Sequence, residues 1–415
     1  MTMANHGRRL LGTAGALILF DLLAVASPAA AQDRLTADAS ASIGVATNPF
    51  LDTGSPPTAI GPTLSFRPTW ISERPLTTLR VEGDAHATFY NRGYGTNESI
   101  SVQGSGTHKL SEFTTLNAAV GYINTIVGTF NDVRVPVGPV VPIGADLPVF
   151  VNDPALGGVG RRRQIYQASG NLVSILSPRD QIEAGVAVSA NRSGGFGLED
   201  FNYATPSVAY SRLLSEKFTV GASFAVGISN YLRSSVGDAT VYQPSLTASR
   251  TISERWTLKA SLGAAIVNLN EGLGQTRTTT TFNGTADLCR RDLRWTACFN
   301  FARQTVPSAF QGVRTSSSAA TSIGYRINEF DDLSLSGSYS HASAPLLRNL
   351  GTPTGNITDN GALDFASVNA NYSHRFRRTL SGFVSGGYAK AFGDSIRREA
   401  NLTATAGITY RFNGR

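Results

Sequence analysis

Four ionisable residues occupy every second position within residues 79–89. They are Arg80, Glu82, Asp84 and His86. Successive side chains of a β-strand point to opposite faces, so a strand here would carry all four on one face. That face could line a water-filled passage and select polar solutes, or it could be a salt-bridged wall that only stiffens the sheet. The pattern leaves both interpretations open.

The two cysteines, Cys289 and Cys298, flank a short polar segment at residues 290–293. If this segment is the turn of a hairpin, the two thiols can meet across it. In an exported protein the surroundings are oxidising and favour a disulfide. Two free thiols that are out of register are the alternative. The bond would be structural, and no Cys/His spacing in the chain predicts a metal site.

A repeat predicts the elements that position these residues. Short polar turns of similar composition recur roughly every 38 residues, with insertions in two intervals. The turns are residues 71–74, 110–113, 176–179, 214–217, 252–255, 290–293, 327–330 and 376–379. Between them, apolar residues alternate with small or polar ones, as in residues 218–228, where Val220 and Phe224 share one face and Ser223 lies on the other. This alternation predicts β-strands.

Longer segments rich in Gly, Asn, Asp and Ser separate the strands at their other ends. They are residues 48–58, 92–97, 128–163, 192–200, 233–238, 270–278, 306–312, 344–362 and 391–399. The loops and turns together divide residues 35–412 into about 18 antiparallel strands, long enough to cross a bilayer when tilted. Short turns at one end and long loops at the other predict an all-β transmembrane barrel. A β-propeller is the rival repeat, but it needs four short strands per period.

The first 31 residues have the layout of a signal peptide. Arg8 and Arg9 precede an apolar run at residues 10–26, which Asp21 interrupts, and three alanines stand before Gln32. We therefore expect the barrel to comprise residues 32–415. An N-terminal membrane anchor is the alternative. Residues 32–415 contain no apolar run of the roughly 18 residues that a transmembrane helix needs.

Aromatic residues gather near the expected membrane boundaries. Trp70, Trp256 and Trp295 flank short turns, and tryptophan suits a bilayer interface because its ring is apolar and its N–H is polar. The tyrosines near the long loops would form a second girdle. These are Tyr122, Tyr166, Tyr203, Tyr231, Tyr242, Tyr339 and Tyr388. The alternative is that these aromatic residues form the core of a soluble β-sandwich.

The longest insertion, residues 128–163, is the third of the long loops. It resembles the third external loop of general and sugar-specific porins, which folds into the barrel and narrows it. The resemblance implies a constriction with residues 161–163 at its exit. Its charged residues would be Asp132, Arg134, Asp146 and Asp153. A loop that caps the outside of the barrel is the alternative.

The whole of residues 32–415 resembles the β-barrel porin-2 family. The resemblance rests on the even hairpin spacing, on the Val-Ala-Thr-Asn-Pro-Phe-Leu segment at residues 45–51, and on a last strand with Ile408, Tyr410 and Phe412 on one face. The chain departs from the usual C-terminal signal in the three residues after Phe412.

The resemblance implies a protein of the outer membrane. Its partners would be the lipid bilayer, lipopolysaccharide and the machinery that inserts barrels. It implies either a channel for passive diffusion of small hydrophilic solutes, anionic or saccharide, or an accessory barrel in exopolysaccharide export with a periplasmic partner.

Composition argues against other classes of function. Only 16% of the residues are charged, as suits a barrel wall better than a helical enzyme. His341 and Ser343 have the His-x-Ser spacing of outer-membrane lipid A deacylases, but those are small barrels and the rest of their pattern is absent. We expect no enzymatic activity and no cofactor. The net charge of +7 favours anionic solutes or an anionic leaflet, and nucleic acid is not an expected partner.

Overall fold

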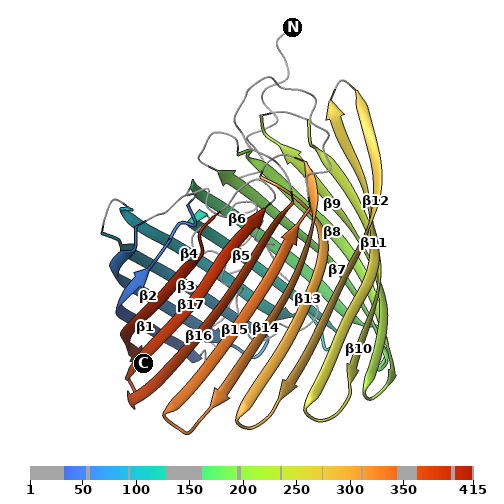
Figure 1. Cartoon of the computed structure of the whole chain (residues 1–415). Helices are drawn as coiled ribbons and strands as arrows, with labels where there is room; N and C mark the ends of the chain where they lie inside the picture. The colour runs from blue at the N-terminus through green and yellow to red at the C-terminus, as the bar shows by residue number, and fades with distance from the viewer. Residues whose placement is uncertain are drawn as a thin grey trace.

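A computed structural model describes the strands of the chain and parts of the loops between them. The described residues are 32–52, 57–91, 94–127, 161–193, 198–233, 236–272, 274–309, 312–343, 362–393 and 398–413. They form one antiparallel sheet of 18 strands, and its first and last strands also pair with each other. The predicted fold, a closed all-β barrel, is therefore confirmed (Figure 1). No helix within the described residues is long and apolar enough to span a membrane.

Each strand pairs with its neighbours in sequence order. The strands are β1 (Gln32–Ala46), β2 (Ala59–Glu73), β3 (Thr77–Phe89), β4 (Thr96–Lys109), β5 (Thr114–Val127), β6 (Arg161–Ile175), β7 (Asp180–Ser193), β8 (Phe201–Ser215), β9 (Phe218–Tyr231), β10 (Ala239–Thr251), β11 (Trp256–Gly272), β12 (Gln275–Arg291), β13 (Trp295–Pro307), β14 (Val313–Arg326), β15 (Asp331–Ala342), β16 (Leu363–Arg377), β17 (Leu380–Gly393) and β18 (Asn401–Asn413). The eight turns predicted from the repeat all lie at one end of the barrel, which we call the short-turn end. The opposite end is the long-loop end.

Serine and asparagine recur in the short turns because their side chains satisfy backbone donors there. Ser177 Oγ accepts hydrogen bonds from the amides of Arg179 and Asp180, both at 3.1 Å. Asn328 Oδ1 does the same for Phe330 and Asp331, at 2.7 and 2.9 Å. Such side-chain bonds stabilise a tight reversal without any further contact. This explains why the turns could be recognised in the sequence.

One predicted loop is wrong. The sequence indicates a loop at residues 270–278, but β11 continues to Gly272 and β12 begins at Gln275. Gly272 and Gly274 have φ angles of 90° and 77°, which glycine adopts without steric cost. The threonines that follow favour extended backbone because they are branched at Cβ. The result is a hairpin that is longer than its neighbours at the long-loop end (Figure 1).

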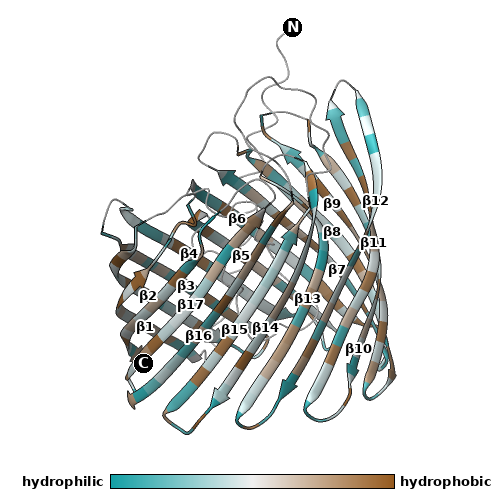
Figure 2. Cartoon of the chain, viewed as in Figure 1, coloured by the Kyte–Doolittle hydropathy of each residue, from teal (hydrophilic) through white to brown (hydrophobic). Residues whose placement is uncertain are grey.

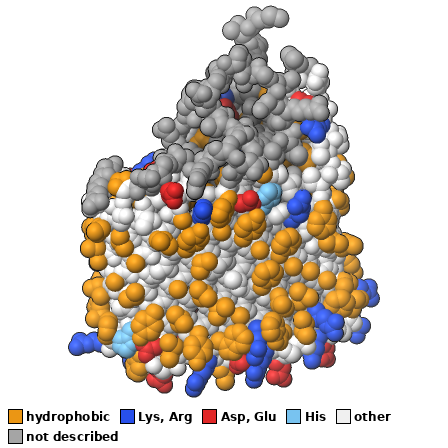
Figure 3. All heavy atoms as spheres, in the orientation of Figure 1, with side chains coloured by type: hydrophobic (Ala, Val, Ile, Leu, Met, Phe, Trp, Pro, Cys, Tyr) orange, Lys and Arg blue, Asp and Glu red, His pale blue; other side chains and the backbone are white. Residues whose placement is uncertain are grey.

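The alternation along the strands gives the barrel two chemically different faces. Large apolar side chains occupy every second position and are exposed, among them Val81, Phe224 and Ile408. On the face drawn in Figure 3 they form a continuous belt, with charged residues gathered below and above it. The intervening positions point inward and are mostly small or polar, so the colours alternate along each strand (Figure 2). An apolar belt of this kind suits a barrel surrounded by lipid.

Cys289 and Cys298 form a disulfide between β12 and β13. The two residues are directly opposite each other in the register, so their side chains lie on the same face. The Cys289 side chain is 4% exposed. The bond is close to the short-turn end of the hairpin and far from the loops that narrow the other end, which fits a structural role.

Candidate functional site

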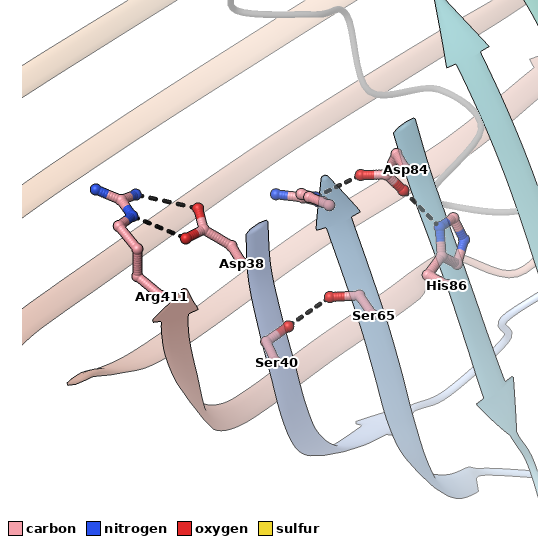
Figure 4. Close-up of polar contacts among 7 residues, drawn as sticks. Asp38, Ser40, Ser65, Asp84, His86 and Arg411 are labelled. Carbon is pink, nitrogen blue, oxygen red and sulfur yellow. Dashed lines mark hydrogen bonds and ion pairs between the residues drawn. The ribbon is translucent and has the colours of Figure 1, made fainter. Parts of the chain in front are cut away.

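A row of alternating charges crosses four neighbouring strands on the inner face of the barrel. Arg411 of β18 is opposite Asp38 of β1, and Asp38 is opposite Arg67 of β2. Arg67 Nε donates a hydrogen bond to Asp84 of β3. Arg411 donates two hydrogen bonds to the carboxylate of Asp38, at 2.8 and 3.0 Å (Figure 4). We call Arg411, Asp38, Arg67 and Asp84 the charge row.

A second row of polar residues runs beside the charge row. Ser40 is opposite Thr409 on one side and Ser65 on the other, and Ser65 is opposite His86. The hydroxyl groups of Ser40 and Ser65 are hydrogen-bonded to each other (Figure 4). His86 Nδ1 lies 3.5 Å from Asp84 Oδ1, so the imidazole connects the two rows.

The side chains of the charge row reach open space although they point inward. Arg67 and Arg411 each keep 57% of their side-chain surface exposed, and Asp84 and Asp38 keep 33% and 32%. Neighbouring strands are only about 4.8 Å apart, so adjacent groups pair while their free sides stay uncovered. The inner wall therefore borders a space that water can enter.

The structure places the four charged residues predicted on strand β3 on this inner face. Val81 and Phe89 on the same strand are exposed on the outer face, and residues 80, 82, 84 and 86 have the opposite parity. Arg80 pairs with Glu82 two residues along the strand, and Asp84 joins the charge row. Whether these side chains line a route for solutes remains a prediction.

The arc of the inner wall next to the charge row, β14 to β17, is lined mainly by hydroxyl and amide groups. In the register, Ser338 of β15 is opposite Ala320 of β14 and Ser367 of β16, and the two serine hydroxyls are 2.7 Å apart. Further inward positions on these strands are Ser318, Ser322, Ser334, Ser336, Ser340, Asn369, Asn371, Ser373 and Ser385. This arc carries fewer charges than the charge row, and one inward ion pair on it, Arg326 with Asp332 at 3.7 Å, lies near the short turns.

The β13–β14 hairpin folds into the barrel at the long-loop end. Pairing between β12 and β13 stops at Gly284 and Arg303, although both strands continue. Beyond this point Thr305 Oγ1 contacts Thr281 Oγ1 at 2.7 Å and donates to Asn283 Oδ1 at 3.1 Å. Thr281 and Asn283 point inward on β12, so β13 has moved to the inner side of its neighbour.

The tip of this hairpin is packed against the inner wall formed by β8 to β11. Val313 is completely buried against the inward-facing side chains of β10 and β11, including Val241 and Val267. Ala309 packs against Leu198, Phe201 and Tyr231 of the β8–β9 region. An ordinary external loop would expose such residues. We call residues 305–309 and 312–316 the inward tip.

Tyr231 fixes the inward tip through hydrogen bonds. Its hydroxyl is 2.7 Å from the carbonyl of Ser308 and 2.6 Å from that of Gly312. The amide of Glu199 donates to the carbonyl of Ala309 at 2.7 Å. Gly312 has a φ of 77°, which allows the chain to reverse directly beside the tyrosine. Both sides of the tip are therefore tied to β8 and β9.

The prediction of an outer tyrosine girdle is wrong for two of its members. Tyr203 and Tyr231 point inward, and Tyr231 is only 5% exposed. Tyr166, Tyr242 and Tyr339 lie on the outer face with more than a third of their surface exposed. Nearness to a long loop could not distinguish these groups, because the two faces differ only by the parity of the position. That parity was the signal that could have found Tyr231.

The first long loop also reaches over the inner wall. Asn48 is fully buried and binds residues 52 and 399 through its side chain, at 2.9–3.1 Å, while its amide donates to Asn401 Oδ1 at 3.0 Å. We call these hydrogen bonds the Asn48 network. Beside it, Leu51 adopts a left-handed conformation with φ of 54°. Leu51 then packs, completely buried, on inward-facing Phe365 and two alanines of β17.

Aromatic side chains lie beside the Asn48 network at the mouth of the barrel. Phe50 stacks on Tyr94 with ring centroids 5.8 Å apart and meets Tyr90 edge-on at 6.1 Å. Burial raises the pKa of both Tyr90 and Tyr94, and the charge of Asp52 adds to the effect at Tyr94. Both phenols therefore stay neutral at physiological pH. The first loop and the inward tip narrow the mouth from different sides.

The predicted constriction at Asp132, Arg134, Asp146 and Asp153 lies outside the described residues. Of the arginines at its expected exit, Arg162 points outward and pairs with Glu98 at 2.6 Å. Arg163 points inward, is 7% exposed and donates to Asn191 Oδ1 at 3.0 Å. Among the described residues, no cluster of three or more His, Cys, Asp and Glu side chains could hold a metal ion.

No protein-family model matches the chain, and no curated protein matches it in sequence. Solved structures do match. The chain is similar to OccK2 (OpdF) of Pseudomonas aeruginosa, with 11% identity over 92% of this chain and 98% of that one and a TM-score of 0.45. It is also similar to OprD of Pseudomonas aeruginosa (10% identity, 92% and 95% covered, TM-score 0.42) and to the FrpB iron transporter of Neisseria meningitidis (8%, 91% and 82%, 0.42).

Proposed function

We propose that this protein is an outer-membrane channel through which small hydrophilic solutes diffuse passively. The exposure of the inward-pointing Arg67 and Arg411, each at 57%, carries the proposal. A packed barrel interior would bury these guanidinium groups. Exposed ion pairs contribute only about 0–1 kcal/mol each to stability, so stiffening alone is a weak reason for them. A polar, hydrated wall is what a solute pathway requires.

The pairing of the charges favours neutral polar solutes such as small saccharides over anions. Each arginine of the charge row has an aspartate opposite it, so the row carries no net charge. The hydroxyl and amide groups on β14–β17 add donors and acceptors without charge. The same proposal makes residues 1–31 an export signal. It places the long loops outside the cell and the short turns in the periplasm.

An accessory barrel in exopolysaccharide export is the second candidate. The inward tip and the buried Leu51 favour it, because both narrow the mouth. A barrel that is closed at rest would serve as a scaffold or as an exit that another component opens. The two candidates differ in whether the purified protein alone passes solutes.

Liposome swelling tests the proposal. Folded protein in liposomes, diluted into isotonic arabinose, glucose, sucrose or a trisaccharide, is expected to cause swelling whose rate falls steadily with solute size. Gluconate should enter no faster than a neutral sugar of similar size. Liposomes with heat-denatured protein serve as the control. No swelling with any sugar, while the barrel still migrates as a folded species in unheated gel samples, would rule out the channel and leave the accessory barrel.

A further inference from the structure

A line of ionisable residues crosses the outer face of the barrel at the long-loop end. The register places Arg303 of β13 opposite Ser317, Ser317 opposite His341, and His341 opposite Asp364. Lys390 of β17 is one position lower, opposite Ala366. Figure 3 shows charged and histidine side chains in a row directly above the apolar belt.

Asp364 does not neutralise the two cations in this line. Its carboxylate accepts a hydrogen bond from the hydroxyl of Tyr339 at 2.7 Å and contacts His341 Nδ1 at 2.7 Å. Arg303 donates instead to Ser317 Oγ at 2.9 Å and to the backbone carbonyl of Phe282 at 3.2 Å. Among the described residues, neither Arg303 nor Lys390 forms an ion pair with a carboxylate. Lys390 Nζ lies over the Phe392 ring, 5.1 Å from its centroid. Both cations keep N–H donors for a partner from outside the chain.

The other end of the same hairpin provides a contrast. Tyr372, His374 and Asp331 repeat the tyrosine–histidine–aspartate arrangement on the outer face near the short turns. The outward positions next to that cluster are Tyr325 and Val384, which carry no charge. The long-loop cluster has Arg303 two strands away on β13 and Lys390 on the adjacent strand β17. A role in holding the β-strands together would not require this difference.

Cations at this height are well placed to bind an anionic partner. A lysine or arginine on the lipid face costs about 2–4 kcal/mol at the bilayer midplane but little near the interfaces. Guanidinium groups bind phosphate through paired hydrogen bonds, and lysine binds it as a point charge. Below the row, exposed Phe301 and Tyr339 offer an apolar surface for acyl chains.

We propose that this face of β13–β17 binds the phosphorylated headgroup of an anionic glycolipid in the outer leaflet. Arg303 and Lys390 are four strands apart, roughly 19 Å at the backbone, so they suit a headgroup that carries phosphates at two separate positions. The hydroxyl of Ser317 lies between them and can meet sugar hydroxyls. The assignment goes beyond the proposed channel and rests only on its orientation, with the long loops outside.

Native mass spectrometry of the full-length folded protein tests the site. The probes are a bis-phosphorylated lipid A-type glycolipid, its monophosphorylated form, phosphatidylglycerol and inorganic phosphate. The variant R303Q/K390Q lacks both cations and should need about tenfold or more glycolipid for half-occupancy. A tenfold loss of affinity corresponds to about 1.4 kcal/mol. Its matched control, R212Q/R290Q, removes two outward-facing arginines at the short-turn end and should bind as the unmodified protein does.

Three results would overturn the assignment. They are equal glycolipid binding by both double variants, phosphatidylglycerol binding as tight as that of the glycolipid, and displacement of the glycolipid by inorganic phosphate. R303Q/K390Q should swell liposomes as fast as the unmodified protein, because both residues lie outside the lumen. Loss of glycolipid binding with unchanged swelling therefore supports the site, and the swelling result tests the channel separately.

Discussion

Replacing the β13–β14 turn region, residues 307–313, with a two-residue Asn-Gly turn is expected to raise the single-channel conductance several-fold. The inward tip packs across the long-loop mouth onto β8–β11, with Val313 and Ala309 buried there. An Asn-Gly turn closes a hairpin tightly, so the shortened hairpin cannot reach the far wall. Planar-bilayer recording of the variant and the unmodified protein in the same salt measures the difference.

A milder change at the same contact is expected to act in the same direction. Tyr231→Phe removes the hydroxyl that bonds the carbonyls of Ser308 and Gly312, and buried hydrogen bonds of this kind are worth about 0.5–1.5 kcal/mol each. We expect more frequent conductance fluctuations without a large change in the mean. Tyr242→Phe, on the lipid-facing side, is the matched control. An unchanged conductance in the shortened variant, with a folded barrel, would show that the tip does not obstruct the passage.

Neutralising the aspartates of the charge row is expected to make the channel select anions. Asp38→Asn together with Asp84→Asn leaves Arg411 and Arg67 without their carboxylate partners. Two uncompensated positive charges then face the lumen, and a surface of one sign enriches the opposite ion. The reversal potential in a KCl gradient should move toward the chloride value.

The converse substitutions give the opposite sign. Arg67→Gln with Arg411→Gln leaves two aspartates and should move the reversal potential toward the potassium value. Both shifts should shrink in concentrated salt, because the Debye length falls from about 10 Å at 0.1 M to about 3 Å at 1 M. Glu98→Gln, which changes an outward-facing residue, is the control. If the aspartate and arginine variants shift in the same direction, or not at all, the charge row does not border the ion path.

The barrel could be predicted from the sequence because its signals are local. Turn serines such as Ser177 satisfy neighbouring amides, so the turns recur with a recognisable composition. The parity of Val81 and Phe89 against Arg80 and Asp84 assigns the two faces of β3. These features need no knowledge of distant strands, and the strand count follows from them.

The narrowing of the mouth could not be predicted in the same way, because it depends on contacts between distant segments. Residues 306–312 are short and look like an ordinary external loop, and nothing near them indicates that Tyr231, some 80 residues away, holds them inside. The Asn48 network likewise joins the first long loop to residues 399 and 401, at the end of the last long loop. The sequence instead predicts the constriction at residues 128–163, because that loop is the longest.

Single-channel recording of the unmodified protein tests the central claim most directly. Folded protein added to a planar bilayer in KCl is expected to give discrete, stable current steps. Their conductance should rise in proportion to salt concentration, as a hydrated lumen requires, and the selectivity should be weak because the charge row is balanced. A protein that stays silent at all voltages, although it has inserted and is folded, would contradict the channel and show that the mouth is closed.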